Sequence, residues 1–198
     1  MVELLRRVAL GMMAAGALFF LDTPLRTLGQ RFTVHRWRER LVLFTFELDL
    51  VALWALGRFY LKWDRRLLPV AAESALALVG TALVMAGVLL AAWAKARLGR
   101  WFSGTFAVKE GHELVSDGPY AITRHPIYTG TLATVLGAAL AWNSLLTLLL
   151  AALLALPLFM HTVYEESLFE QHFGDAYRDY ERRVPRLVPL VRRGRSIP

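Results

Sequence analysis

The sequence predicts an all-α membrane protein: a polytopic bundle of about five transmembrane helices with a C-terminal amphipathic helix. Hydrophobic residues make up 56% of the 198 residues, and the mean hydropathy is +0.42, well above the range of soluble proteins. Apolar runs near the length of a membrane span recur along the chain. Lysines and arginines gather in the segments between these runs. The length suits a single domain, 1–198.

The composition also excludes some classes of site and partner. The chain has no cysteine, so it can form neither disulfides nor thiolate metal sites. A net charge of +7 can indicate nucleic-acid binding. Here, however, the arginines lie between apolar runs and at the C-terminus, which is the pattern of membrane topology and of contact with lipid headgroups. We therefore expect membrane lipids and no nucleic acid as partners.

The first apolar run, Val8–Leu21, is short for a span. With Leu4 and Leu5 it would reach across a bilayer if Arg6 and Arg7 extend to the interface. A signal peptide is the alternative, because two arginines precede an apolar core. The residues that follow, Phe19–Asp22, do not form a small-residue cleavage site.

A basic connector, Asp22–Arg40, leads to the second predicted span, Leu41–Leu61. This span contains Glu47 and Asp49. Acids within a membrane segment face a cavity or a partner as a rule. Two interpretations stay open here: a functional role, or pairing with an arginine of the preceding connector.

The third predicted span is Val70–Ala94, where Gly80 and Gly87 would permit close approach of another helix. After the polar segment Lys95–Arg124, two further spans form a tight hairpin. They are predicted at Ile127–Trp142 and Leu145–Val163, with the turn at Asn143-Ser144.

Five spans place the two termini on opposite sides of the membrane. Counted by side, seventeen lysines and arginines lie on the side of the C-terminus and six on the other. The positive-inside rule then places Lys95–Arg124 and the C-terminus in the cytoplasm.

Beyond the last span, aromatic and apolar residues recur at helical spacing, with charged residues between them. They are Phe169, Phe173, Tyr177, Tyr180 and Val184. This pattern predicts an amphipathic helix that lies on the membrane or on the bundle. Gly174 interrupts it at a cost of about 1 kcal/mol relative to alanine. The arginines at 192, 193 and 195 are expected to contact headgroups.

The most unusual stretch is Gly118–Gly130, GPYAITRHPIYTG, which sets hydrogen-bonding side chains directly before an apolar run. Pro126 biases His125 away from helical geometry and is tolerated in the first turn of the helix that follows. The N–H groups of that turn have no partner within the helix, so they suit a carboxylate or another anion. A polar loop that caps a membrane helix is the plainer interpretation.

Together with EESLFEQHFGDAYRDYERRVPRLVP, which follows about thirty-five residues later, this stretch resembles the isoprenylcysteine carboxyl methyltransferase family. These are integral membrane enzymes that use S-adenosylmethionine, with phospholipid and thiol methyltransferases as relatives. The resemblance covers about Trp101–Pro189. It implies a cytoplasmic cofactor pocket and methyl transfer to a lipophilic acceptor, an isoprenylcysteine-type carboxylate.

Alternatives are thiol S- or phospholipid N-methylation, a membrane NADPH-dependent reductase of related fold, and a catalytically silent protein that keeps the pocket. The chain contains no glycine-rich fingerprint of a dinucleotide-binding sheet, and methyl transfer needs no metal.

The resemblance also implies roles for individual residues. Those expected to bind the cofactor are His112, Glu113, Leu114, Val115, Tyr120, His125, Pro126, Ile127, Tyr128 and Glu165. Those expected to be catalytic are His161, Glu166 and Arg183, the last with a role that could be structural.

His161 is a departure from the family pattern. Four residues before Glu165, on the same helical face, the family commonly has an arginine that is associated with the substrate carboxylate. A histidine is not a permanent, bidentate cation. His161 could instead be a general base for a thiol or amine acceptor, or a hydrogen-bonded residue at the membrane boundary.

Overall fold

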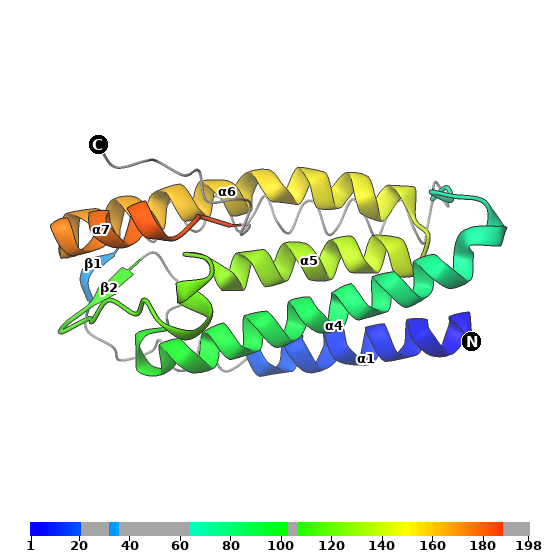
Figure 1. Cartoon of the computed structure of the whole chain (residues 1–198), viewed down its shortest axis with the longest axis horizontal. Helices are drawn as coiled ribbons and strands as arrows, with labels where there is room; N and C mark the ends of the chain where they lie inside the picture. Colours follow the sequence, from blue (N-terminus) through cyan, green and yellow to red (C-terminus); the bar gives the residue numbers. More distant parts are fainter. Residues whose placement is uncertain (21–31, 36–63, 103–106, 188–198) are drawn as a thin grey trace.

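The computed structural model describes residues 1–20, 32–35, 64–102 and 107–187, and these are predominantly helical. Among the described residues the long helices lie side by side with their axes roughly aligned (Figure 1); they are α1 (Val2–Phe20), α4 (Glu73–Leu98), α5 (Pro126–Ala141) and α6 (Leu145–Phe173). Helix α4 packs against both α1 and α5, and α5 packs against α6. In chain order the elements are α1 (Val2–Phe20), β1 (Phe32–His35), η2 (Val70–Ala72), α4 (Glu73–Leu98), η3 (Gly99–Trp101), β2 (Ala107–Lys109), η4 (Gly118–Ala121), α5 (Pro126–Ala141), α6 (Leu145–Phe173) and α7 (Asp175–Arg183).

Glycines bring α4 and α5 into backbone contact. A Cβ atom added at Gly87 would lie 2.5 Å from the carbonyl oxygen of Gly130, and one added at Gly80 would lie 2.5 Å from that of Gly137. The close helix approach predicted from Gly80 and Gly87 is thus confirmed, and its partner is α5.

Two helices within the described residues are long and apolar enough to cross a membrane. One is α4 with its flanking turns, Val70–Trp101, with a mean hydropathy of 2.4, and the other is α6, Leu145–Phe173, with 2.1. Large apolar side chains on both remain exposed, among them Leu78 and Leu89 on α4 and Leu149 and Leu156 on α6. Helix α5 is apolar but only 16 residues long. The predicted span Leu41–Leu61, with Glu47 and Asp49, and the C-terminal arginines lie outside the described residues.

The predicted hairpin between α5 and α6 is confirmed. Asn143 adopts a positive φ of 49° at the turn, and its side-chain oxygen accepts hydrogen bonds from the N–H groups of Leu67 and Leu68 at 3.0 and 2.9 Å. The hydroxyl of Ser144 accepts from the N–H of Thr147 and caps α6. Helix α6 then continues as far as Phe173, well beyond the expected end at Val163.

Two features at the opposite end of the bundle differ from the prediction. β1 pairs with β2 in an antiparallel ladder, within segments that were expected to be polar connectors. The predicted amphipathic segment, Phe169–Val184, is divided at Gly174, whose positive φ of 56° ends α6 and starts α7. Tyr177 and Tyr180 of α7 are buried, and the Tyr180 hydroxyl donates to the carbonyl oxygen of Tyr120 at 2.7 Å. Helix α7 therefore packs on the protein.

Candidate active site

A buried cluster of charged side chains lies where α5 begins, and Glu166 of α6 is its centre. The Nε2 atom of His125 lies 3.0 Å from Oε1 of Glu166. Arg186 donates to the same carboxylate from Nε, at 3.0 Å, and from Nη2 to the other oxygen. Nη1 of Arg124 lies 3.2 Å from Oε1. One carboxylate thus joins residues from α6, from the start of α5 and from the segment after α7.

Glu165, the neighbouring carboxylate, faces the other side of the His125 ring. Its Oε2 lies 3.4 Å from Nδ1 of His125. Its Oε1 accepts a hydrogen bond from the hydroxyl of Tyr128 at 2.6 Å. The side chain of Glu165 is 24% exposed whereas that of Glu166 is 8% exposed, so Glu165 is the carboxylate of the pair that a ligand can reach.

The C-terminal segment completes the cluster through its backbone. The N–H of Arg124 donates to the carbonyl oxygen of Pro185 at 2.8 Å, and the N–H of His125 donates to that of Arg186 at 3.1 Å. The hydroxyl of Thr123 donates to the carbonyl oxygens of Arg186 and Leu187. These bonds fix the polar turn before α5, since they satisfy backbone groups that the non-helical geometry of His125 leaves outside the helix.

Carboxylates outnumber guanidinium groups in this cluster. Arg124 also pairs with Glu181 of α7 at 2.5 Å. The cluster thus holds two arginines and the three carboxylates of Glu165, Glu166 and Glu181, so its net charge is negative by one when His125 is neutral and zero when His125 is protonated.

The environment shifts the pKa of the groups at this turn. Burial alone would lower the pKa of His125, but hydrogen bonds to Glu165 and Glu166 outweigh it, so the pKa of His125 is raised. Burial raises the pKa of Tyr120 well above its usual value, and the nearby charge of Glu165 adds to the effect. His125 thus gains a proton more readily than a free histidine, and Tyr120 keeps its hydroxyl proton.

His161 lies within the same group of residues. Its side chain is fully buried on α6, and its ring meets that of Tyr128 edge to face with centroids 5.7 Å apart. The ring of Tyr128 also stacks on that of His125 at 5.7 Å. Tyr128 thus lies between the two histidine rings.

His112 belongs to a separate aromatic cluster. Its ring stacks on Trp101 at 5.0 Å and meets Phe169 and Phe173 of α6 edge to face. Burial, with the nearby charges of His172 and Lys109, lowers its pKa to about 4, so the ring is neutral at physiological pH. Its Nδ1 atom is buried and has no hydrogen-bond partner among the described residues.

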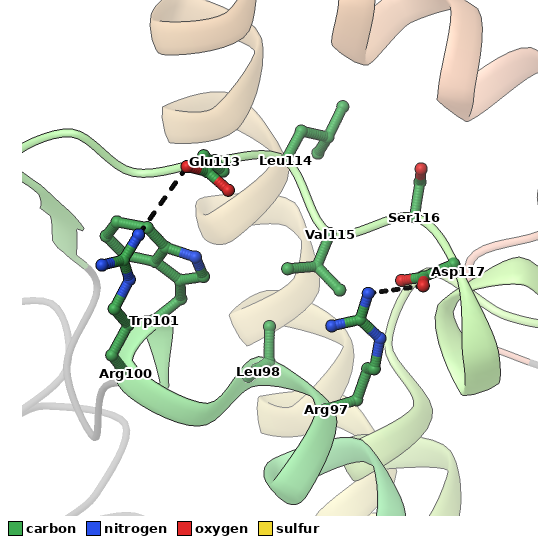
Figure 2. A pocket seen from close by; sticks show the side chains of 9 residues that line it. All are labelled: Arg97, Leu98, Arg100, Trp101, Glu113, Leu114, Val115, Ser116 and Asp117. Carbon is green, nitrogen blue, oxygen red and sulfur yellow. Dashed lines mark hydrogen bonds and ion pairs between the residues drawn. The ribbon is translucent and has the colours of Figure 1, made fainter.

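Next to this cluster a polar hollow of about 470 Å³ opens between the end of α4 and the segment before η4. Figure 2 shows the side chains of Leu98, Leu114 and Val115 along the hollow and two ion pairs at its rim. Arg97 pairs with Asp117, and Arg100 pairs with Glu113 at 3.7 Å. Glu113, Leu114 and Val115, all expected to bind the cofactor, thus line one hollow.

The predicted site residues therefore form two groups, joined by α6. One group gathers at the start of α5 and comprises His125, Pro126, Ile127, Tyr128, His161, Glu165 and Glu166, with Tyr120 close by. In the other, Glu113, Leu114 and Val115 line the hollow, and His112 stacks on Trp101 beside them. Glu165 and Phe169 are four residues apart on α6, so one face of α6 connects the groups.

One predicted catalytic residue lies apart, and three residues of the cluster were not predicted. Arg183 is exposed on α7 and donates to the carbonyl oxygen of Asp179 at 3.1 Å. Arg186, three residues later, contacts Glu166. In the sequence analysis Arg124 and Arg186 were counted only among the basic residues that set the membrane orientation, and Glu181 was not singled out. For Arg124 the sequence did offer a signal, because this residue directly precedes the pair His125-Pro126.

Comparison with known proteins agrees with the motif. Residues 76–176 match the phospholipid methyltransferase family. The chain is 34% identical over 108 residues to a protein-S-isoprenylcysteine O-methyltransferase of Schizosaccharomyces pombe, covering 53% of this chain and 46% of that protein. It is 32% identical over 115 residues to protein-S-isoprenylcysteine O-methyltransferase B of Arabidopsis thaliana, covering 57% and 58%.

A relative with a different name also matches. The cobalt-zinc-cadmium resistance protein CzcN of Cupriavidus metallidurans is 29% identical over 109 residues, with 55% of this chain and 49% of that protein covered. The chain spans about half the length of the curated relatives that it matches.

Proposed function

The chain belongs to the phospholipid methyltransferase family, and from that premise we propose that it transfers a methyl group from S-adenosylmethionine to a lipophilic acceptor. The observation that carries the proposal is the cluster at the start of α5. There, His125 and Tyr128 both contact the carboxylate of Glu165, which a ligand can reach.

The residues present fit this donor. A sulfonium is a cation, and the partly exposed carboxylate of Glu165 attracts cations. The donor's own carboxylate suits the first-turn N–H groups of α5, which have no partner within the helix. The unpaired Nδ1 of His112 offers a buried acceptor or donor beside the hollow that Leu114 and Val115 line. Both of the groups expected to bind the cofactor thus offer suitable polar contacts.

When bound, the donor would supply an activated methyl group: the acceptor atom would bond to the methyl carbon as the carbon–sulfur bond breaks, and the sulfonium would leave as a neutral thioether. The chain's own residues have to hold both reactants in line and exclude water. Glu165 and Tyr128, which bond to each other at 2.6 Å, are the groups we place against the donor. We give buried Glu166 the task of fixing His125 and Arg186 in position.

We propose an isoprenylcysteine-type carboxylate as the acceptor. Two relatives at 34% and 32% identity are named protein-S-isoprenylcysteine O-methyltransferases, which supports this choice. A phospholipid amine is the second candidate, and the family match favours it. His161 would then be the base for the proton that an amine loses. In either case the acceptor is lipophilic.

We also propose that the whole chain is one polytopic membrane domain with its site and C-terminus in the cytoplasm. The apolar helices α4 and α6 support the membrane location, and the seventeen-to-six distribution of basic residues supports the orientation. Reporter fusions at Pro198 and within the turn at Asn143 should report opposite sides of the membrane. Identical signals from the two fusions would contradict the orientation.

Titration of detergent-purified protein with S-adenosylmethionine and, separately, NADPH tests the proposed function. We expect binding of the first, and transfer of labelled methyl to one member of a panel of lipophilic carboxylates, thiols and amines. Tyr128→Phe removes the hydroxyl that bonds to Glu165 and should weaken donor binding about 10-fold or more. Binding of NADPH alone would establish the reductase alternative, and binding of neither would leave a silent protein.

A further inference from the structure

The guanidinium of Arg186 lies at the border between the charged cluster and the apolar surface of α6. On one side it bonds to both oxygens of Glu166. On the other side its central carbon lies 5.2 Å from the ring centroid of Phe159, an exposed aromatic residue of α6. The side chain of Arg186 remains 30% exposed, so a ligand can reach part of this cation.

Glu166 uses only one edge of the guanidinium. The bonds leave from Nε and Nη2, whereas Nη1 makes no hydrogen bond or ion pair within the part of the chain that the structure describes. A guanidinium has five N–H donors in a fixed fork. Because Glu166 is buried and also bonds to His125, it fixes the orientation of the fork and leaves the second edge for another anion.

Phe159 is part of an exposed apolar strip. Leu156, Phe159 and Val163 follow one another at spacings of three and four residues, so they share a face of α6, and all three are exposed. The strip ends one turn before Glu166. A ligand with a long apolar chain and a terminal anion would match this sequence of surfaces, with its chain on the strip and its anion at Arg186.

We propose that Arg186 binds the anionic group of the methyl acceptor, a carboxylate carried on an isoprenoid chain that lies along Leu156, Phe159 and Val163. The proposal rests on the proposed methyl transfer and adds a residue that determines acceptor specificity. Through Glu166 and His125, the bound anion is held next to the turn where Tyr128 and Glu165 meet. Arginine stays charged at every physiological pH, so this selection does not depend on a proton.

The test compares an acid with its uncharged counterpart. Binding of S-farnesylcysteine and of its carboxamide to the detergent-purified protein is measured by titration calorimetry. Wild type should bind the acid about 10-fold or more tightly than the amide, because a charge-assisted hydrogen bond is made only with the acid. Arg186→Gln should bring the two affinities within about twofold, since it removes the cation and keeps most of the polar volume.

Kinetics separate binding from a structural role. In Arg186→Gln the KM for S-farnesylcysteine should rise about 10-fold, and by a larger factor than the dissociation constant for S-adenosylmethionine. Arg186→Lys should recover part of the preference for the acid. The matched control is Arg182→Gln, a nearby exposed arginine whose ion pair is with Asp179 on its own helix, and it should behave like wild type.

Three outcomes would overturn the proposal. The first is equal affinity of wild type for the acid and the amide, which needs no variant and so stands even if Arg186→Gln fails to fold. The second is an equal loss of affinity for both ligands in Arg186→Gln. The third is that Arg186→Gln loses turnover on phosphatidylethanolamine vesicles but keeps wild-type affinity and turnover with S-farnesylcysteine, which would mean that Arg186 binds a lipid phosphate. If the wild type binds S-farnesylcysteine more tightly than its carboxamide but transfers no methyl group, the proposed function is contradicted and the role of Arg186 in binding the acid is not.

Discussion

Replacement of Glu166 by glutamine tests whether the cluster at the start of α5 depends on one buried carboxylate. Glu166 is 8% exposed and receives contacts from His125, Arg124 and Arg186. Glutamine keeps the shape of the side chain but removes its negative charge. The guanidinium groups of Arg124 and Arg186 then lose the carboxylate that neutralises them. Breaking a buried ion pair by removing one partner costs about 3–5 kcal/mol.

Glu170 provides a matched comparison one turn further along α6. It is half exposed and pairs with exposed Arg178 at 3.4 Å. Exposed pairs of this kind contribute about 0–1 kcal/mol. The two substitutions are chemically identical and occur on the same helix, so the difference between them isolates the effect of burial and of the three cationic contacts.

Thermal unfolding in detergent at pH 6 is the assay, followed by circular dichroism. For a chain of this size each 1 kcal/mol shifts the midpoint by about 2–4 °C. Glu166→Gln should therefore lower the midpoint by about 6–20 °C, and Glu170→Gln by a few degrees at most. A midpoint for Glu166→Gln that equals that of Glu170→Gln would refute the central role of this carboxylate.

Two further changes test the same structure by other routes. The pKa of His125 is raised in the folded state, so the contribution of His125 to stability is complete below the unfolded pKa of about 6.5 and is lost as the pH rises through the folded pKa. The midpoint of thermal unfolding of the wild type should therefore fall between pH 6 and 9. A fall of the same size in His125→Gln would assign the pH dependence to another group. Gly87→Ala places a Cβ 2.5 Å from the Gly130 carbonyl oxygen and should cost about 1–3 kcal/mol in unfolding titrations. Gly11→Ala, with no neighbour within 4 Å, should be neutral or stabilising, and equal effects of the two glycine changes would contradict the contact between α4 and α5.

The elements that follow from local chemistry could be predicted from the sequence. Gly80 and Gly87 indicated a close helix contact, and Asn143-Ser144 indicated a tight hairpin, because small residues and turn residues act over a few positions. The sequence predicted an interruption at Gly174 but underestimated its effect on the helix. A helix cost of about 1 kcal/mol suggested a tolerated interruption, whereas the positive φ at Gly174 ends α6 and lets Tyr177 and Tyr180 pack on the bundle.

The charged partners of the cluster could not be predicted, because they depend on which distant segments meet. Glu166 and Arg186 are twenty residues apart, and Arg124 and Glu181 fifty-seven. Arg183 and Arg186 both belong to the RRVPR stretch, and no local pattern distinguishes the exposed residue from the one at Glu166. The pairing of β1 with β2 was missed for the same reason, since strands of four and three residues are too short to show a period.

The return of residues 185–187 to the turn before α5 has a consequence for biosynthesis. The ribosome makes this segment after α4, α5, α6 and α7, so a nascent chain that already carries His125, Glu165 and Glu166 still lacks Arg186 and the carbonyl oxygens to which Arg124 and His125 donate. Until then the carboxylates of α6 are short of a counter-charge, and a buried carboxylate without one is costly. The site therefore assembles only after residues 185–187 have been made, and a nascent chain stalled before residue 185 would expose the carboxylates of Glu165 and Glu166 to the quality-control machinery of the cell.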